Sequence, residues 1–333
     1  HSQPSRDITY GRIDAKTGQT KFFKVQGLDN IAAVSHGIIR DPKGVIWLNI
    51  GPTILPRHGG LGRIDAETQK LDIFVPAPQM SGTGGSLDYD GKGKIWITAP
   101  DGAFRFDPDS HEFTEFKSLI PAKNDKGSAQ TYGAAGDSDG NGWWAQMAQD
   151  AIVKGEVETG KSLQINLPAV MVNGISPEDR AFYDSVSDLG FNNPTLTSQG
   201  PRRMGTDKNA DVLWIGNSWS ATLAKINTRT LETSIIPFPD YTMQAYHIAV
   251  DTKHQVWANL WTSDRVAKLD PATNKWTTFE LPVRGTEMRH LTVDEQGGVL
   301  KVSMPVYRTN QMGVMTMRSD EDIAKLKQQV ASR

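Results

Sequence analysis

The chain has 333 residues, enough to bury a sizeable core, and its formal net charge of −2 arises from well-mixed acidic and basic residues. With this charge balance no basic face for nucleic acid stands out, and a charged macromolecular partner is not implied. Because the chain has no cysteine, disulfides and thiolate metal sites within it are excluded. No apolar run approaches the roughly 18 residues that a membrane-spanning helix requires.

Two short segments at the start of the chain, YGRIDAKTG and TKFFKV, are predicted strands with no earlier strands to pair with. They have the pattern of the third and fourth strands of the repeating unit that follows. We therefore expect them to complete the last unit of the chain, so that the repeat array closes on itself. The C-terminal segment MGVMTMRS competes for the same third-strand position.

The rest of the chain is dominated by a repeat in which an apolar strand ends in Asp, a turn follows, and a second strand carries Trp. It occurs six times, beginning with HGIIRDPKGVIWLN and ending with RHLTVDEQGGVLKVS. Its aspartates are Asp41, Asp90, Asp137, Asp207, Asp251 and Asp294. Six residues later lie Trp47, Trp96, Trp143, Trp257 and Leu300, whereas Trp214 follows its aspartate by seven residues. We expect the tryptophans to pack between neighbouring units.

A third and a fourth strand follow most of these pairs, as in LGRIDAETQ and LDIFVPAP. One twisted four-stranded sheet cannot bury both faces alone, so units of this length stack around a ring as the blades of a β-propeller. The predicted fold is therefore all-β: a propeller of four-stranded blades with six clear sequence repeats and six or seven blades. Residues 1–320 are expected to form this propeller domain.

Residues 169–200 interrupt the repeat, and they account for the long step of 71 residues from Trp143 to Trp214. The segment VNGISPEDRAFYDS within it has the pattern of a degenerate first strand pair, which would make a seventh blade. The alternatives are a surface loop with one short helix and a lid over the channel mouth. At the end of the chain, residues 319–333 are predicted to form an amphipathic helix.

The candidate functional residues share one register of the repeat, four or five residues before its Asp. These positions begin the innermost strands, so residues far apart in the sequence should converge on one mouth of the central channel. They are His36, Tyr132, Arg202, Arg203, Tyr246, His247, Arg289 and His290. Asn217 and Asn259, at the far ends of the second strands, are predicted to add an amide rim.

Three of the seven histidines fall in this register, on three different units. His247 and His290, on neighbouring units, could bind a divalent metal ion through neutral imidazole, or one of them could act as a general base. The alternative is that each is a hydrogen-bonded structural residue. Arg203 and Arg289 could stabilise negative charge on a substrate oxygen, or they could form ion pairs between blades. Glu287, in the loop before His290, is interpreted as a solvated acid.

The units HGIIRDPKGVIWLN, LGRIDAETQKLDIFVP and YHIAVDTKHQVWAN resemble the virginiamycin B lyase (streptogramin lyase) family of propellers. The resemblance covers most of residues 8–318 and rests mainly on the structural repeat. It implies seven blades and a metal-assisted elimination that opens a cyclic depsipeptide with magnesium and a histidine base. His247 matches the family's first catalytic histidine and His290 the second. The family's two glutamates fall at Met288 and Met304 here, which departs from the catalytic pattern.

A fainter resemblance concerns VNGISPEDRAFYDS, which is similar to a segment of calcium-dependent gluconolactonase-like propellers. In those proteins the Asn of the Asn-Gly pair binds metal, which implies that role for Asn173. The family's acidic metal ligands have no identifiable counterparts in this sequence.

Three functional hypotheses remain open. The first is an enzyme that carries out lyase-type proton abstraction on a small cyclic or oxygenated substrate at the channel mouth. The second is a non-catalytic propeller that binds a ligand or partner as one module of a longer protein. The third is a metal-dependent lactone hydrolase. Cysteine avoidance favours a periplasmic or secreted location, and neither a nucleic-acid partner nor a membrane span is expected.

The residue roles that belong to the first hypothesis are as follows. The catalytic residues are His247, His290, Arg289 and Tyr246, and a magnesium or calcium ion would be held by the two histidines. The substrate-binding residues are His36, Tyr132, Arg202, Arg203, Asn217 and Asn259.

Overall fold

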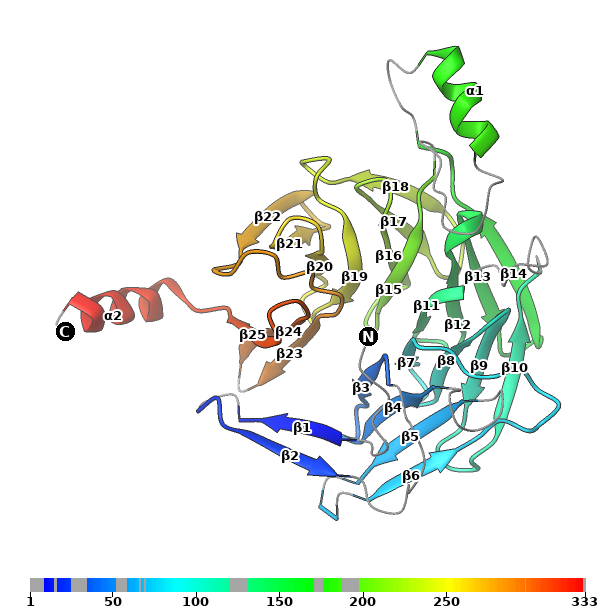
Figure 1. Cartoon of the computed structure of the whole chain (residues 1–333), viewed down its shortest axis with the longest axis horizontal. Coiled ribbons are helices and arrows are strands. Elements are labelled where there is room, and N and C mark those ends of the chain that lie inside the picture. Colours follow the sequence, from blue (N-terminus) through cyan, green and yellow to red (C-terminus); the bar gives the residue numbers. More distant parts are fainter. Residues whose placement is uncertain are drawn as a thin grey trace.

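Antiparallel sheets radiate from a central axis like the blades of a propeller, and Figure 1 views the ring along that axis. This computed structural model describes residues 9–14, 17–24, 35–51, 59–65, 67–68, 70–119, 131–170, 176–186, 198–296 and 298–331. Strands that are neighbours within a sheet are also consecutive in the sequence. The all-β propeller predicted from the repeat is confirmed.

Five of the described sheets have four strands each, with the first strand of each innermost in the ring (Figure 1). The first blade comprises β3 (Ile38–Arg40), β4 (Ile46–Ile50), β5 (Gly60–Ile64) and β6 (Leu71–Phe74). The second blade comprises β7 (Leu87–Tyr89), β8 (Ile95–Ala99), β9 (Gly102–Phe106) and β10 (Phe113–Lys117). The third comprises β11 (Thr131–Gly136), β12 (Gly142–Gln146), β13 (Ala151–Glu156) and β14 (Lys161–Asn166), with the 3-10 turn η1 (Met147–Gln149) after β12. The fourth blade comprises β15 (Pro201–Asp207), β16 (Val212–Asn217), β17 (Thr222–Asn227) and β18 (Thr233–Pro237). The fifth blade comprises β19 (Ala245–Val250), β20 (Val256–Leu260), β21 (Arg265–Asp270) and β22 (Lys275–Glu280).

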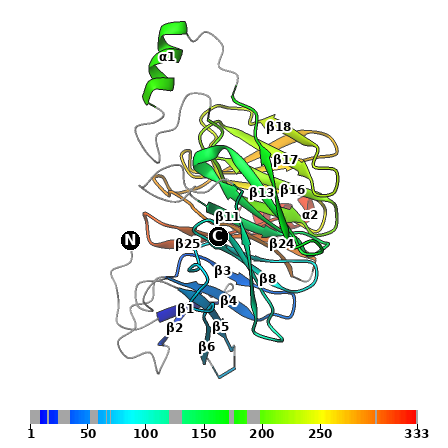
Figure 2. The same ribbon diagram turned by 90° about the vertical axis from the view of Figure 1, so that its right-hand side faces the viewer.

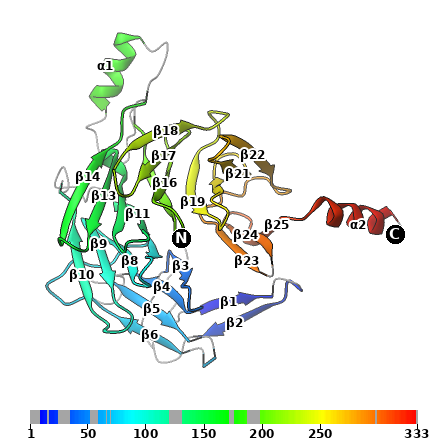
Figure 3. The same ribbon diagram turned by 180° about the vertical axis from the view of Figure 1, so that it is seen from behind.

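The sixth blade has three described strands, β23 (Thr292–Gln296), β24 (Val299–Val306) and β25 (Gln311–Thr316). The first strands of the chain, β1 (Thr9–Ile13) and β2 (Thr20–Lys24), form a separate two-stranded sheet. Figures 1 and 3 show this hairpin between the first and the sixth blade. The described residues therefore form six blades, and β1 and β2 lie in the sector that a seventh blade would occupy.

The prediction that the N-terminal strands complete the last blade is wrong for the described residues. β25 takes the third-strand position instead, with Met315 opposite Val302 of β24. Because β25 follows β24 after a short turn, this pairing closes a far smaller loop than a strand from the other end of the chain would. Tyr10 of β1 packs with Ile50 and Ile73 of the first blade.

One hydrogen bond recurs between the end of the first strand and the second strand of a blade. In the first blade, Trp47 Nε1 donates to Asp41 Oδ2 at 2.9 Å, while Asp41 Oδ1 accepts from Val45 N at 2.9 Å. The same indole bond joins Trp96 to Asp90, Trp143 to Asp137 and Trp257 to Asp251. Each of these tryptophans is buried against apolar residues of the next blade, so the predicted inter-blade tryptophan core is confirmed.

The fourth blade departs from this pattern because its turn is one residue longer. The extra residue moves Trp214 out of register with Asp207, although the indole remains buried. His254 of the fifth blade takes over as partner, with its Nδ1 2.6 Å from Asp207 Oδ2. The buried aspartate is thus paired even where the tryptophan is displaced.

Helix α1 (Pro177–Val186) is the element described within residues 169–200. Ser176 caps it, since its Oγ accepts from Asp179 N at 3.0 Å, and Pro177 stands at the first helical position. These signals override the weak strand pattern, so the described part of this segment is not a degenerate strand pair. Figures 1 and 2 show α1 outside the ring, and it therefore does not form a lid over the channel.

Helix α2 (Asp320–Ala331) lies within the segment for which the sequence predicts a C-terminal helix. It has no buried residue and projects away from the blades in Figure 1. Among the described residues, no helix combines the length and the apolar character needed to cross a membrane.

The recurring indole bond can be tested with a matched pair of variants. Trp257→Phe removes the donor to Asp251, whereas Trp214→Phe removes a buried indole that does not bond to its repeat aspartate. We expect Trp257→Phe to lower the free energy of unfolding by about 1–3 kcal/mol more than Trp214→Phe, because it leaves a buried carboxylate oxygen without its donor. Urea unfolding followed by circular dichroism measures both values, and equal losses would contradict a structural role for the bond.

Candidate functional site at the channel mouth

Three neighbouring inner strands carry a β-bulge at the mouth of the channel. The strand pairing shifts within residues 131–134 of β11, 201–204 of β15 and 245–247 of β19. A bulge sets two residues of one strand opposite a single residue of its partner, so consecutive side chains no longer alternate strictly between the two faces. Arg202 and Arg203 are consecutive, and both lie against the same pair of tyrosine rings.

Buried asparagines on the second strands hold the mouth residues in place. Asn259 Oδ1 accepts from His247 N at 2.6 Å, and Asn259 Nδ2 donates to Met288 O of the next blade at 2.9 Å. In the first blade, Asn49 Oδ1 accepts from His36 N at 2.7 Å. The side chains of these asparagines therefore position the backbone on which the histidines stand.

The predicted amide rim differs from this arrangement. Asn217 and Asn259 are both 0% exposed, so neither side chain lines an open channel. Asn217 Nδ2 donates to Gln199 Oε1 at 3.2 Å and to Thr222 Oγ1 at 2.9 Å, within its own blade. Direct contact of these two asparagines with a ligand stays a prediction.

The structure brings three histidines of the mouth together from the first, fifth and sixth blades. His290 is central, because the centroid of its ring lies 6.0 Å from that of His36 and 5.6 Å from that of His247. The ring centroid of Tyr246 lies 6.4 Å from that of His290. His36 is the most exposed of the three, while His247 and His290 are partly buried.

Burial and neighbouring arginines disfavour the charged form of all three histidines. Burial, followed by Arg203 and Arg289, lowers the pKa of His36 to about 4. Burial, followed by Arg203, lowers the pKa of His247 to about 3. The pKa of His290 lies well below its usual value, chiefly because of burial and then because of Arg203. At neutral pH the histidines are uncharged.

Arg202 lies against three aromatic rings at the mouth. Its Cζ is 4.5 Å from the ring centroid of Tyr246, 4.8 Å from that of Tyr132 and 5.1 Å from that of Trp261. The hydroxyls of the two tyrosines are hydrogen-bonded to each other. Burial, followed by the nearby Tyr132, raises the pKa of Tyr246 to about 12, so Tyr246 is protonated at neutral pH.

Arg203 is almost completely buried behind Arg202. It is 4% exposed, and its Nη1 donates to Ser86 Oγ at 3.1 Å. Burial lowers the pKa of its guanidinium. Neither Arg202 nor Arg203 forms an ion pair with a carboxylate in the part of the chain that the structure describes.

Four side chains at the mouth have buried donor atoms for which the described residues offer no hydrogen-bond partner. These atoms are Arg202 Nε and Nη1, Arg203 Nε, Arg289 Nε and Trp261 Nε1. Most buried polar groups in proteins are paired, and leaving one unpaired costs about 1–3 kcal/mol. These five unpaired atoms are all donors, whereas Asn217 Oδ1 is a buried acceptor without a partner among the described residues. Donors predominate, so the mouth favours an acceptor.

Arg289 belongs to a small ion-pair network in the sixth blade. Glu287 accepts from both Arg289 and Arg308, and these two bonds lower its pKa. The Cζ of Arg289 also lies 4.5 Å from the ring centroid of Tyr307. The interpretation of Glu287 as a solvated loop acid is wrong: its side chain is 13% exposed because two arginines enclose it.

The described residues do not contain a cluster of three or more His, Asp, Glu or Cys side chains that could hold a metal ion. Met288 and Met304, at the positions of the lyase family's glutamates, are buried in the apolar core of the sixth blade. His247 Nδ1 accepts from Leu291 N at 3.2 Å, which places the ring proton on Nε2. A neutral His247 in this state has no free lone pair with which to bind a metal.

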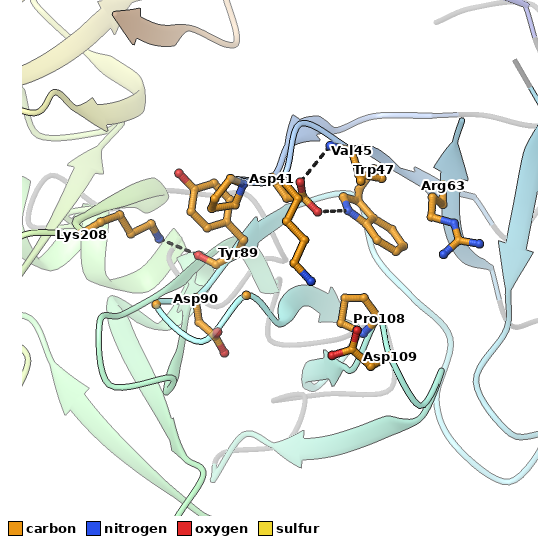
Figure 4. A pocket seen from close by; sticks show the side chains of 13 residues that line it. Asp41, Val45, Trp47, Arg63, Tyr89, Asp90, Pro108, Asp109 and Lys208 are labelled. Atoms are coloured by element: carbon orange, nitrogen blue, oxygen red, sulfur yellow. Dashed lines mark hydrogen bonds between the residues drawn. The ribbon is translucent and has the colours of Figure 1, made fainter. Parts of the chain in front are cut away.

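A cavity of about 480 Å³ lies at the other end of the inner strands, between the first and second blades (Figure 4). Trp47, Arg63 and Tyr89 are among its lining residues. Lys208 reaches its edge, where its Nζ donates to Asp88 Oδ2 and to Tyr89 O, each at 2.7 Å. None of the residues predicted for the channel mouth lines this cavity.

Three residues that contact the arginines of the mouth were not among the site residues predicted from the sequence. Ser86 stands four residues before Asp90, the register that carries the histidines, so its position gave a usable signal. Trp261 follows a second strand, and Tyr307 follows β24. Their positions in the repeat do not indicate that they stack on arginines.

Neither a protein-family model nor a curated protein sequence matches this chain. The fold nevertheless defines it as a β-propeller, and solved structures match it. Virginiamycin B lyase from Staphylococcus aureus superposes with a TM-score of 0.60 at 15% identity, covering 86% of this chain and 85% of that one. A streptogramin B lyase structure gives a TM-score of 0.61 at 15% identity, covering 96% and 90%.

An extracellular domain from B. thetaiotaomicron is also similar, with a TM-score of 0.52 at 14% identity. This likeness covers 85% of the present chain but 36% of that one. At such identities the comparisons show the fold. The resemblance to the streptogramin lyase propellers is confirmed at that level.

The buried histidines predict an acid-sensitive fold. Because the pKa of His247 is about 3 in the folded protein and about 6.5 in an unfolded chain, the unfolded state binds a proton that the folded state does not, and stability falls as the pH drops below about 6.5. In His247→Asn, Oδ1 can accept from Leu291 N but the side chain does not titrate. We expect this variant to lose less unfolding free energy than the wild type between about pH 7 and pH 4.5, as measured by urea unfolding. Identical losses would show that His247 is not buried in its neutral form.

Proposed function

We propose that the channel mouth is the small-molecule site of a lyase-type enzyme, which removes a proton from a carbon beside a substrate carbonyl. The observation that carries the proposal is the placement of neutral His290 between two other histidines and near the charge of Arg203. A neutral imidazole can accept a proton, and a buried guanidinium can stabilise the oxyanion that forms.

In the proposed step, His290 takes the proton and the electron pair of the C–H bond becomes a new C=C bond. The bond to the leaving oxygen breaks, with its electron pair remaining on that oxygen. Arg203 and Arg289 stabilise the enolate charge, and the Tyr246 hydroxyl protonates the leaving oxygen. The resulting tyrosinate regains its proton from His290, which restores both groups.

His290 suits the role of base better than His247, because His247 Nδ1 already accepts from Leu291 N. An anionic substrate would offset the arginine charge that lowers the pKa of His290. Its pKa would then rise toward neutrality, where a general base is most effective.

A magnesium or calcium ion at His247 and His290 stays a prediction, and the described side chains do not fit it. The ring of His247 has no free lone pair while it bonds to Leu291, and the mouth carries arginines where a cation would need carboxylates. The proposed step therefore assigns charge stabilisation to the arginines. Asn173, the metal ligand implied for a lactone hydrolase, lies outside the described residues.

A non-catalytic binding module is the second candidate. The low pKa values of His36 and His247 make them weak bases, and the extracellular domain from B. thetaiotaomicron shows that a similar fold occurs as part of a longer chain. For either candidate we propose a periplasmic or secreted protein with a small-molecule ligand and without a nucleic-acid partner.

Hydrogen–deuterium exchange into substrate carbon atoms would test the catalytic proposal. The wild-type protein is incubated in D₂O with a panel of lactones, cyclic depsipeptides and carboxylates that carry an acidic C–H bond, and exchange or elimination is followed by NMR. We expect at least one compound to exchange, and we expect His290→Ala to slow that exchange by about 10²- to 10⁴-fold, the usual contribution of a general base.

His111→Ala is the matched control, since His111 lies in an exposed outer turn of the second blade. It should exchange at the wild-type rate. Equal rates in His290→Ala and the wild type would exclude His290 as the base. Binding without exchange across the whole panel would instead favour the non-catalytic module.

A further inference from the structure

We propose that the channel mouth binds a small organic dianion, held by Arg202, Arg203 and Arg289. This inference rests on the proposed small-molecule site but not on its catalytic step. It specifies the charge class of the ligand: two negative charges carried by oxygen atoms, as in a dicarboxylate or a phosphate monoester.

The charge balance of the mouth calls for about two negative charges. Of the three arginines, Arg289 pairs with Glu287, which it shares with Arg308. Arg202 and Arg203 have no carboxylate partner in the described ranges of the chain, and the three neighbouring histidines are neutral. The two guanidinium charges of Arg202 and Arg203 therefore remain uncompensated among the residues that the structure describes, and the charge of Glu287 is divided between Arg289 and the exposed Arg308.

The mouth also has more hydrogen-bond donors than the described residues have acceptors for them. Arg202 contributes two unpaired nitrogens, while Arg203, Arg289 and Trp261 contribute one each. The hydroxyls of Tyr132 and Tyr246 bond to each other and Tyr246 also hydrogen-bonds to Arg203, yet these nitrogens, Arg203 Nε included, find no partner among the described residues. Carboxylate and phosphate oxygens have several lone pairs each and form strong charge-assisted hydrogen bonds with guanidinium groups.

The site is built before a ligand arrives. Arg203 is 4% exposed and anchored by Ser86, so a ligand does not have to order it. Arg202 makes cation–π contacts with three aromatic rings, and Arg289 donates a hydrogen bond to Glu287. Burying unpaired positive charge is unfavourable in the free protein, and an anion at the mouth would relieve that penalty.

The position of the mouth restricts the size of the ligand. Arg202 and Arg203 lie in β15, the innermost strand of the fourth blade, and Arg289 precedes β23, the innermost strand of the sixth blade, by three residues. Arg203 is 4% exposed, so a ligand that contacts it has to be small enough to reach between these strands. This favours a small molecule over a folded or polymeric anion.

Isothermal titration calorimetry of the whole chain at neutral pH and low salt tests the proposal with four probes. Succinate is the dicarboxylate, inorganic phosphate the phosphate, acetate the monoanion and succinamide the uncharged isostere of succinate. We expect succinate or phosphate to bind at least about tenfold more tightly than acetate, and succinamide not to bind, because a second negative charge adds charge-assisted hydrogen bonds to the arginines. If succinate binds more tightly, the ligand class is a dicarboxylate, and if inorganic phosphate does, it is a phosphate monoester.

Arg203→Met and Arg289→Met should each weaken dianion binding by about 10- to 100-fold. Arg229→Met is the control. Arg229 is an exposed arginine in the turn between β17 and β18 that pairs with Asp139 and Asp211. This variant should bind the dianion as tightly as the wild type does. Arg289 is only partly buried, so Arg289→Met keeps the test valid if Arg203→Met does not fold.

The proposal is overturned if neither dianion binds more tightly than acetate, or if folded Arg203→Met and Arg289→Met bind like the wild type. The outcome is separable from that of the catalytic step. Dianion binding without carbon-bound exchange would leave this inference intact and favour the non-catalytic module over the lyase activity. Exchange confined to uncharged substrates would support the lyase activity and count against a dianionic ligand.

Discussion

The buried hydrogen bond from a tryptophan indole to the aspartate that ends the inner strand is the interaction on which the ring depends. The aspartate also accepts from backbone amides of the following turn, as Asp41 does from Val45 and Asp251 from Gln255. One side chain thereby fixes the turn and holds the indole that packs against the next blade. This bond occurs in four blades, and in the fourth His254 pairs with Asp207 instead. The repeated contact gives these blades a common orientation, so the starts of their inner strands point to one mouth.

The chemistry of the mouth arises where the inner strands depart from that regular pattern. Bulges in three consecutive blades let neighbouring side chains gather on one surface, and Arg202 with Tyr246 is one result. Burial, followed by the charge of Arg203, then lowers the pKa values of His247 and His290 and keeps both neutral. An excess of unpaired donors beside neutral imidazoles favours an anionic ligand over a metal ion, which sets this mouth apart from the acid-containing site that the family resemblance implies.

Much of this arrangement could be predicted from register alone, because repeat position determines where an inner strand starts. His36, His247 and His290 were placed together in this way. Register could not show that the Asn259 side chain turns inward to bond His247 N, since a side chain at a strand end can point either way. It also could not show that Glu287 sits between two arginines, because Arg308 lies beyond the repeat.

The sequence by itself determined the propeller, its six clear repeats, the tryptophan core and the mouth at which the candidate residues meet. These features follow from short-range signals, namely strand periodicity and the fixed step from Asp to Trp, which act within one blade. Only the tertiary structure decided which strand closes the sixth blade, which nitrogen of His247 carries the proton and which charges stay unpaired. Those properties depend on bulges, burial and contacts between blades far apart in the chain, and a repeat pattern does not encode them.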